Sequence, residues 1–397
     1  MSRIDDLIAE LCPDGVPFKP LGELGRRNGG TAITAGHMKA IAEDGGPIRV
    51  FAGGQTIADV AEGSVPAKDV VRVPSIIIKS RGHIGCTYYD RPFTHKSELW
   101  SYSISRSDVD QKFVYYYLLT QVDRLQDVAR ATSVKLPQLG VRDTDTLRIP
   151  VPPIEVQWEI VRVLDLFTTL EAELEAELEA RRRQYAHYWN ALLTPRADWR
   201  KMALGEIADI FDGPHATPRK TAAGPWYLSI SSLRNGRFDL TESARLGEDQ
   251  FVSWTRRVAP CLGDTMFSYE TRIGQAGYWD RDEPAALGRR MGLLRPRRSV
   301  VDPRFLTLAY LGPQFQSVIR AKIVRGATVD RIPIADMSTW EVFVPCLEEQ
   351  ARIVAILDRF EALVSDLSVG LPAELAARRR QYEHYRDRLL TFEEAVA

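Results

Sequence analysis

Few stretches of this chain combine the residue types and spacing that catalysis needs. Asp110, Gln111 and Lys112 form a D-x-K sequence, which occurs in nucleases, but one such sequence is expected by chance in most chains of 397 residues. A P-loop needs a Gly-rich turn closed by Gly-Lys-Ser or Gly-Lys-Thr, and a hydrolase elbow needs G-x-S-x-G; the sequence contains neither. The single Pro-Pro pair, at 152–153, lacks the preceding Asn or Asp of an amino-methyltransferase loop. The absence of these catalytic motifs favours a protein without a catalytic centre of its own.

The cysteines and histidines show no spacing typical of metal ligands. The four cysteines include no C-x-x-C pair, and the six histidines are scattered, so we expect no metal site and the free thiols of a reducing cytoplasm. His187 and His384 lie beside tyrosines at equivalent places, where packing on a helix face is a better interpretation than catalysis. The acidic N-terminus and the lack of an apolar run of about 20 residues predict neither a secretory signal nor a membrane span. The expected location is cytoplasmic.

Loops rich in Arg, Lys, hydroxyl groups and Gly suggest a different chemistry, the binding of nucleic acid. The net charge is −1, but residues 196–343 hold 22 Lys and Arg against 17 Asp and Glu, so a basic groove can exist on a neutral chain. Arg and Lys bind phosphates, and Arg and Asn read base edges. A solvated loop explains any one residue equally well, but similar sets at matched positions in both halves of the chain favour contact. The predicted contacts are Lys79, Ser80, Arg81, His83, Lys135, His215, Thr217, Arg219, Lys220, Ser231, Arg234, Asn235, Arg237, Tyr269, Thr271, Arg272 and Arg331.

The same unit occurs twice along the chain. The stretch VPPIEVQWEIVRVLDLF at 151–167 aligns with VPCLEEQARIVAILDRF at 344–360, an offset of 193 residues. Farther on, RRRQYAHYWNALLT at 181–194 aligns with RRRQYEHYRDRLLT at 378–391, an offset of 197. The four-residue difference is close to one helical turn, so an apolar face can continue through it. Weaker matches precede both copies: 21–24 with 204–207, 75–85 with 264–274, and 131–137 with 327–333.

Both aligned stretches have the period of an amphipathic helix. In the first, apolar residues recur every three or four positions from Ile160 to Leu192, which predicts a helix of about 60 Å over roughly 154–193. A helix of this length with one apolar seam needs a partner, and the second copy has an equivalent seam. We therefore expect an antiparallel pair. Gly370 and Pro372 should break the second helix, where the first has EAEL units instead.

Short β-branched runs such as SIIIKS alternate with Gly, Asp and Pro turns and with short helices in the remaining segments. The predicted fold class is α/β (α+β). Two globular domains with mixed sheets would be separated by two long helices packed as an antiparallel coiled coil, with a pseudo-two-fold internal repeat. The expected segments are a first globular domain with its N-terminal lead-in at 1–150, a central long helix at 151–195, a second globular domain at 196–343 and a C-terminal helical region at 344–397.

These stretches resemble the specificity subunit of a type I restriction–modification system. The resemblance covers essentially the whole chain and rests on LIAELCPDGVPFKPLGEL near the start, the two aligned helix stretches, DGPHATP, and the terminal LVSDLSVGLPAELAARRRQYEHYRDRLLTF. It implies two target recognition domains that each read half of a bipartite double-stranded DNA site. It also implies helices that set the spacer between the halves and dock two methyltransferase subunits. The first helix departs from the family pattern because it lacks the Gly-Leu-Pro break.

The resemblance further implies that this subunit has no cofactor. S-adenosylmethionine, ATP and Mg would bind partner subunits, among them the restriction subunits of the full complex. We expect the partner-binding residues to be Gln157, Arg181, Arg182, Gln184, Tyr185, Gln350, Arg378, Arg379, Gln381 and Tyr382.

Other interpretations remain at this point. The Arg residues of RRRQY could only pair with nearby glutamates, as Arg181 could with Glu177. The chain could be an autonomous DNA-modifying or DNA-cleaving enzyme with a cryptic site, or a coiled-coil adaptor that does not bind DNA.

Overall fold

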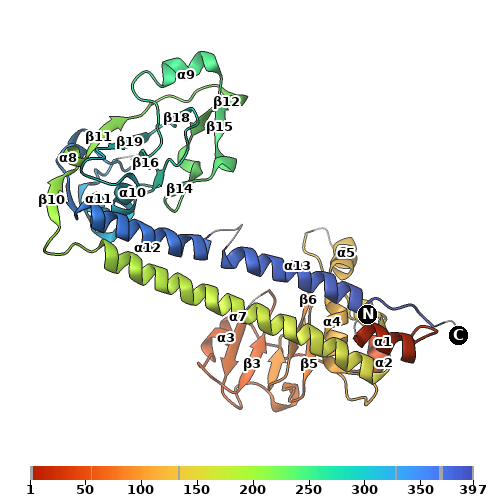
Figure 1. Ribbon diagram of the computed structural model, residues 1–397. Coiled ribbons are helices and arrows are strands. Elements are labelled where there is room, and N and C mark those ends of the chain that lie inside the picture. The colour runs from red at the N-terminus through yellow and green to blue at the C-terminus, as the bar shows by residue number, and fades with distance from the viewer. Residues whose placement is uncertain (1–2, 55, 133–134, 327–328, 366–369, 396–397) are drawn as a thin grey trace. The chain divides into compact units, whose positions relative to one another are not determined.

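The computed structural model describes residues 3–54, 56–132, 135–326, 329–365 and 370–395 (Figure 1). The chain forms two compact units. One comprises the described residues up to Leu174 and from Leu375 onward, and the other comprises those from Glu175 to Glu374. Each unit therefore contains one globular domain, part of the central helix and most of one C-terminal helix.

The domain of the first unit is built on an antiparallel sheet with the strand order β2-β8-β5-β6. Its central strand β5 has the apolar run Ile76, Ile77 and Ile78, and all three side chains are buried. A second sheet, β4-β3-β7, is mixed because β3 and β7 run parallel. The elements are α1 (Arg3–Leu11), β1 (Phe18–Pro20), α2 (Leu21–Leu24), β2 (Arg26–Asn28), α3 (Ala35–Ala40), β3 (Ile48–Phe51), β4 (Ile57–Val60), β5 (Ser75–Lys79), β6 (Gly85–Tyr89), β7 (Phe93–His95), β8 (Trp100–Ser103), α4 (Gln111–Thr120), α5 (Val122–Thr132), α6 (Val141–Asp145) and β9 (Arg148–Pro150).

The domain of the second unit repeats this plan. Its antiparallel sheet has the order β11-β19-β16-β17, and a second sheet, β15-β12-β18, is again mixed because β12 and β18 run parallel. The elements are β10 (Arg200–Ala203), α8 (Leu204–Ile207), β11 (Ala208–Asp212), β12 (Lys220–Leu228), β13 (Leu233–Arg234), β14 (Arg237–Phe238), β15 (Ala244–Leu246), α9 (Glu248–Trp254), β16 (Thr265–Ser268), β17 (Ala276–Tyr278), β18 (Ala285–Leu287), β19 (Met291–Pro296), α10 (Pro303–Leu311), α11 (Pro313–Lys322) and β20 (Glu341–Val344). The repeat seen in the sequence is therefore a repeat of a mixed α/β domain, as predicted.

Equivalent helices join each domain to its long helix. Asp110 is the N-cap residue of α4, and its carboxylate accepts hydrogen bonds from the backbone N–H groups of Lys112 and Phe113. Asp302 is the N-cap residue of α10, and its carboxylate accepts a hydrogen bond from the backbone N–H of Phe305. Both phenylalanines are buried in the cores where these helices meet the long helices. Burial of these apolar faces holds each domain on its helix.

The long helices are α7 (Ile154–Leu193), α12 (Leu347–Ser365) and α13 (Leu371–Leu389). Figure 1 shows α13 along the first part of α7 and α12 along its later part. In the first unit Phe167 of α7 stacks on Tyr385 of α13, with ring centroids 5.6 Å apart. In the second unit Tyr188 of α7 stacks on Phe360 of α12 at 5.1 Å. These helices run antiparallel to α7, as predicted.

The C-terminal helical region is interrupted at the predicted place. Helix α12 ends at Ser365 and α13 begins at Leu371, with Gly370 immediately before it. Pro372 lies in the first turn of α13, where a missing backbone N–H breaks no helical hydrogen bond. Leu367, which the apolar period of the second copy places in its seam, lies outside the described residues. Helix α7 has no such interruption over its 40 residues.

Candidate nucleic-acid interface

In the first domain the predicted contacts lie where β5 ends. Lys79 is the last residue of β5, and Arg81 and His83 are exposed in the turn that follows. Arg81 forms a β-bridge with Gln138 and donates to its Oε1 at 3.4 Å, which fastens the segment after α5 to this turn. Lys135, close before Gln138, is also exposed. The structure therefore brings four of the predicted residues into one cationic region.

The structure corrects the prediction for one residue of this set, Ser80. Its side chain is buried, and its hydroxyl donates a hydrogen bond to the backbone carbonyl of Glu98. The hydroxyl fixes the turn from inside and leaves no group for DNA. The prediction of a DNA contact at Ser80 is wrong because strand alternation turns this residue inward while Arg81 turns outward.

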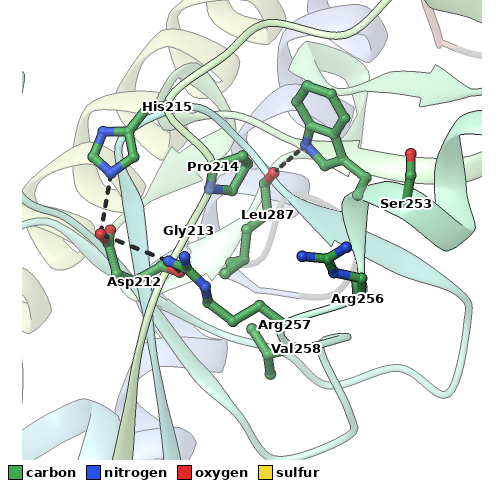
Figure 2. Close-up of a pocket in the computed structure, with 10 residues that line it drawn as sticks. Asp212, Gly213, Pro214, His215, Ser253, Arg256, Arg257, Val258 and Leu287 are labelled. Atoms are coloured by element: carbon green, nitrogen blue, oxygen red, sulfur yellow. Dashed lines mark hydrogen bonds and ion pairs between the residues drawn. The ribbon is translucent and has the colours of Figure 1, made fainter.

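In the second domain His215 is the centre of a chain of polar contacts. Its Nε2 lies 3.1 Å from Asp212 Oδ2 (Figure 2), and its Nδ1 lies 2.7 Å from Arg290 Nη1. Because a guanidinium can only donate, we infer that Nδ1 accepts and that Nε2 carries the proton given to Asp212. Arg290 also pairs with Glu270 at 3.0 Å. The exposed imidazole is thus held in one orientation.

A cavity of about 450 Å³ lies beside His215, between residues 212–215 and the turn after α9. Figure 2 shows Arg256 and Arg257 reaching into it from this turn. Arg257 donates to the backbone carbonyl of Asp212 at 3.3 Å, whereas Arg256 has no hydrogen-bond or ion-pair partner within the described parts of the chain. Both arginines are exposed. Sequence reasoning missed them, although the Arg-Arg pair in the basic segment was a usable signal.

The other predicted residues near His215 lie on the surface. Thr217, Arg219 and Lys220 are exposed where the loop leads into β12. Arg219 lies 3.6 Å from Asp249, an exposed ion pair that constrains it little. These three side chains are available for contact.

A tight hairpin carries the next predicted set. Residues 234 and 237 pair across β13 and β14, so Asn235 and Gly236 form a two-residue turn with φ of 45° and 87°. Positive φ at both positions is the type I′ hairpin geometry that Asn-Gly favours. Arg234 and Asn235 are exposed at its end. Ser231 is exposed too, and its hydroxyl lies 2.7 Å from that of Ser229.

The guanidinium of Arg237 is bonded to an acidic residue of its own domain and to one of helix α12. Its Nε donates to Glu361 Oε1 at 2.8 Å, and its Nη1 lies 3.8 Å from Asp280. The hydrogen bond to Glu361 raises the pKa of Arg237 further. Its side chain is still 49% exposed, so the DNA contact at Arg237 stays a prediction, made by a guanidinium that also has a structural role.

Tyr269 and Arg272 also have structural roles. Tyr269 is buried, and this burial, together with the nearby Asp212 carboxylate, raises its pKa. Arg272 has a φ of 54° and donates to the backbone carbonyls of Ile230 and Leu233, at 3.1 and 3.2 Å. The predicted DNA contact at Tyr269 is thus wrong because the ring is buried. Arg272 brings the 271–272 turn to the 230–234 loop. The remaining two predicted residues, Thr271 and Arg331, are exposed.

The predicted partner-binding residues divide into buried and surface groups. Gln157 and Gln350 are fully buried with their amides hydrogen-bonded within the chain, so their prediction as surface contacts is wrong. Tyr185 and Tyr382 are partly buried against the rings of Phe360 and Phe167. The others lie on α7 and α13 with at least part of the side chain exposed: Arg181, Arg182, Gln184, Arg378, Arg379 and Gln381.

Two of these arginines have acidic partners on the long helices. Arg181 lies 3.3 Å from Glu177 of the same helix, the pairing expected from their spacing of four. Arg379 of α13 donates to Glu171 of α7 at 2.6 Å. Both are exposed pairs, so little free energy is needed to exchange the carboxylate for a group on another protein.

The D-x-K sequence is structural. Asp110 caps α4, and Lys112 Nζ is bound to Asp165 Oδ2 of α7 at 2.6 Å. Among the described residues, no cluster of three or more His, Cys, Asp or Glu has the geometry of a metal site. The described helices also include none with the length and apolar character needed to cross a membrane.

Comparison with known proteins agrees with the duplicated architecture. The model of the type I restriction modification DNA specificity domain matches twice, at residues 13–180 and 196–377. The specificity subunit of the type I restriction enzyme EcoR124I/EcoR124II of Escherichia coli is 28% identical over 302 residues, covering 71% of this chain and 70% of that protein.

Two solved structures share the fold. The S subunit of a type I restriction–modification system from M. genitalium has a TM-score of 0.58 at 16% identity, covering 95% of this chain and 96% of that one. A chain from a study of complex assembly in a type I system has a TM-score of 0.56 at 17% identity, covering 95% and 98%. The two family matches span most of both units, and the chain therefore belongs to the type I restriction–modification DNA specificity family, as a non-catalytic specificity subunit with two target recognition domains and no cofactor of its own.

Proposed function

We propose that this chain recognises an interrupted double-stranded DNA sequence in the cytoplasm, with residues 1–150 reading one half-site and residues 196–343 the other. The observation that carries the proposal is the duplication itself. The two domains have the same sheet order, but the loops at equivalent strand ends differ: KSRGH follows β5, and SYETR follows β16. One framework with two different sets of loops is suited to reading two different sequences.

In the second domain, two classes of contact are proposed. Arg256 and Arg257 would bind backbone phosphates at the cavity beside His215, because neither guanidinium is neutralised by a close hydrogen-bonded carboxylate. Asp212 Oδ2 lies 3.1 Å from His215 Nε2 and 4.0 Å from Arg257 Nη1, so it holds Arg257 only through a long ion pair. Arg234 and Asn235, at the end of the hairpin, have the donor and acceptor groups that read base edges. In the first domain, Arg81, His83 and Lys135 would supply the contacts to DNA.

The long helices are proposed to position the domains and to dock two methyltransferase subunits, with restriction subunits completing the full complex. Segments 151–195 and 344–397 would supply this surface. Exposed side chains such as Arg182 and Gln381 on the duplicated RRRQY stretches support this assignment, because two similar stretches suit two copies of one partner. S-adenosylmethionine, ATP and Mg would bind to the partner subunits.

A domain exchange tests the bipartite assignment. Residues 196–343 are replaced by the corresponding segment of a relative with a known site, and methylated bases are mapped in cells that carry the matching methyltransferase genes. We expect one half of the mapped site to change while the other half stays as in the wild type. A change in both halves, or a continuous site without an unspecified centre, would overturn the proposal.

The rival function, an autonomous enzyme, has a direct test of its own. The isolated chain is incubated with S-adenosylmethionine and DNA, and methyl transfer is measured. We expect none until methyltransferase subunits are added.

A further inference from the structure

Each unit contains a cation that lies between an aromatic ring of the sheet and a carboxylate of the long helix. In the first unit Lys112 of α4 lies 5.6 Å from the ring centroid of Tyr88 and 2.6 Å from Asp165 of α7. In the second unit Arg304 of α10 lies 5.7 Å from the ring centroid of Tyr278 and donates to Asp358 of α12 at 2.9 Å. The two aspartates occupy the same place in the repeat.

We call each of these arrangements, where a domain is bonded to its long helix, a joint. The two joints differ in the number of charged residues and in how far those residues are buried. Arg304 also binds Glu361, one turn farther along α12, where the first copy has Thr168. The side chains of Arg304 and Glu361 are 9% and 10% exposed, whereas those of Lys112 and Asp165 are 38% and 35% exposed. The second unit therefore has a buried Arg304–Glu361 pair at the centre of its network, with Asp358 and Arg237 at the edge, 36% and 49% exposed. The first unit has only the partly exposed Lys112–Asp165 pair.

The network around Arg304 and Glu361 extends to the hairpin formed by β13 and β14. Glu361 also accepts a hydrogen bond from a second guanidinium, that of Arg237, which is the first residue of β14. Arg304 Nη1 also donates to the backbone carbonyl of Gly236, in the turn that presents Asn235, at 3.4 Å. Helix α12 is thus bonded through one carboxylate to the strand and through Arg304 to the turn that the proposed function assigns to base reading.

Because the Arg304–Glu361 pair is buried, this network fixes the orientation of the hairpin more than it stabilises the fold. A buried ion pair gains little net free energy because desolvation offsets the attraction, but a broken one leaves an uncompensated charge. Planar guanidinium groups bonded to carboxylates also tolerate few orientations. The hairpin therefore cannot turn on α12 without breaking bonds to Glu361.

We propose that Arg304, Glu361 and Arg237 are positioning residues that hold the hairpin of the second domain at one angle on α12, and that this angle restricts the complex to one spacer length. The inference rests on the proposed bipartite reading of DNA. A half-site displaced by one base pair moves about 3.4 Å along the helix axis. A domain fixed on its helix cannot follow that displacement, whereas a domain on a loosened joint can.

The repeat provides the test variant. Arg304→Lys combined with Glu361→Thr gives the second unit the residues of the matched positions in the first. The matched control is Arg295→Lys, because Arg295 also lies over an aromatic ring, that of Phe211, and pairs with the buried Asp264, but entirely within the domain. The assembled methyltransferase complex is assayed on duplexes whose mapped half-sites are separated by the native spacer or by one base pair fewer or more.

We expect the double variant to lose about ten-fold in discrimination between the native and altered spacers, while its selectivity for each half-site stays unchanged. Glu361→Thr alone keeps the Arg304–Asp358 pair and should show a smaller loss in the same direction if the double variant fails to assemble. The control should keep full spacer discrimination even if its unfolding midpoint falls.

Unchanged spacer discrimination in an assembled joint variant overturns the inference. Altered half-site selectivity also overturns it, because the network would then act on base reading and not on the spacer. A wild-type complex whose methylation does not depend on one of the two half-sites refutes the proposed bipartite function itself, which separates the two failures.

Discussion

Gln157 Oε1 accepts a hydrogen bond from the backbone N–H of Asp110 at 2.8 Å and so joins α7 to the N-cap residue of α4. Its Nε2 donates to the backbone carbonyls of Asp108 and Pro152, at 2.9 and 2.7 Å. One buried amide therefore satisfies three backbone groups where the domain meets its long helix. This leaves no polar atom of Gln157 for another protein.

Gln350 makes the same three kinds of contact in the second unit. Its Oε1 accepts from the N–H of Asp302 at 2.7 Å, and its Nε2 donates to the carbonyls of Val300 and Pro345, at 3.1 and 2.8 Å. Two glutamines 193 positions apart in the repeat thus have one structural role. Their repetition reflects a shared junction between domain and helix.

Gln157→Leu should destabilise the first unit, because a side chain of similar size replaces the amide and leaves the N–H of Asp110 and two carbonyls unpaired. We expect the free energy of unfolding to fall by about 2–3 kcal/mol in a urea titration. The control is Glu155→Ala, at an exposed position just before Gln157 on the same helix. It should change the free energy of unfolding by less than about 0.5 kcal/mol. Full stability with loss of methyltransferase copurification would restore Gln157 as a partner contact.

Local patterns predicted the parts of the fold that depend on neighbouring residues. The apolar period predicted a helix at 154–193, and α7 occupies Ile154–Leu193. Gly370 and Pro372 predicted the interruption between α12 and α13. An Asn-Gly pair between short strands produced the hairpin turn at 235–236. Each of these features is decided within a few residues by backbone sterics or by side-chain periodicity.

Contacts between distant residues could not be predicted in this way. Arg237 and Glu361 are 124 positions apart, so nothing local marks the guanidinium as already bonded. Gln157 lies in a helix where a polar residue normally faces solvent, and only the fold places the α4 junction over it. The cavity with Arg256 depends on the packing of α9 against the 212–215 segment. The candidate site was therefore predictable as loops but not as individual contacts.

His95 should make the stability of the first domain depend on pH. The ring is buried between Lys96 O and Ser101 Oγ, and this burial lowers its pKa below the ordinary value of about 6.5. Below that pH the unfolded chain binds a proton that the folded domain does not, so the free energy of unfolding should fall as pH decreases from about 6.5, by up to ~1.4 kcal/mol per pH unit. Urea titrations at pH 7.5 and 5.5 measure this loss.

His95→Asn isolates the contribution of the imidazole. The variant should be less stable than the wild type at pH 7.5 but should lose less stability on acidification. Equal losses in both proteins would show that His95 does not titrate in this range and that other groups carry the pH dependence.

Arg256→Ala and Arg257→Ala should weaken DNA binding by the assembled complex without changing sequence preference. Loss of one phosphate contact reduces affinity equally for specific and unrelated DNA, and it reduces the slope of log K against log salt by about one. Anisotropy titrations over a series of salt concentrations measure both quantities. Arg320→Ala, an exposed arginine of α11 that does not line this cavity, is the control with the same change in charge. A change in preferred bases would make these arginines base contacts.

Deletion of Glu171–Leu174 should shorten the unspecified spacer by one or two base pairs while leaving both half-sites unchanged. The four residues span about 6 Å of helix, close to the rise of two base pairs. Because the EAEL unit is repeated, Glu175 moves into the position of Glu171, so α7 still presents a carboxylate to Arg379. The seam within the first unit is thereby retained, and the residues after the deletion shift as a block. Mapping of methylated bases with the deletion variant measures the spacer, and an unaltered spacer would show that this stretch does not set its length.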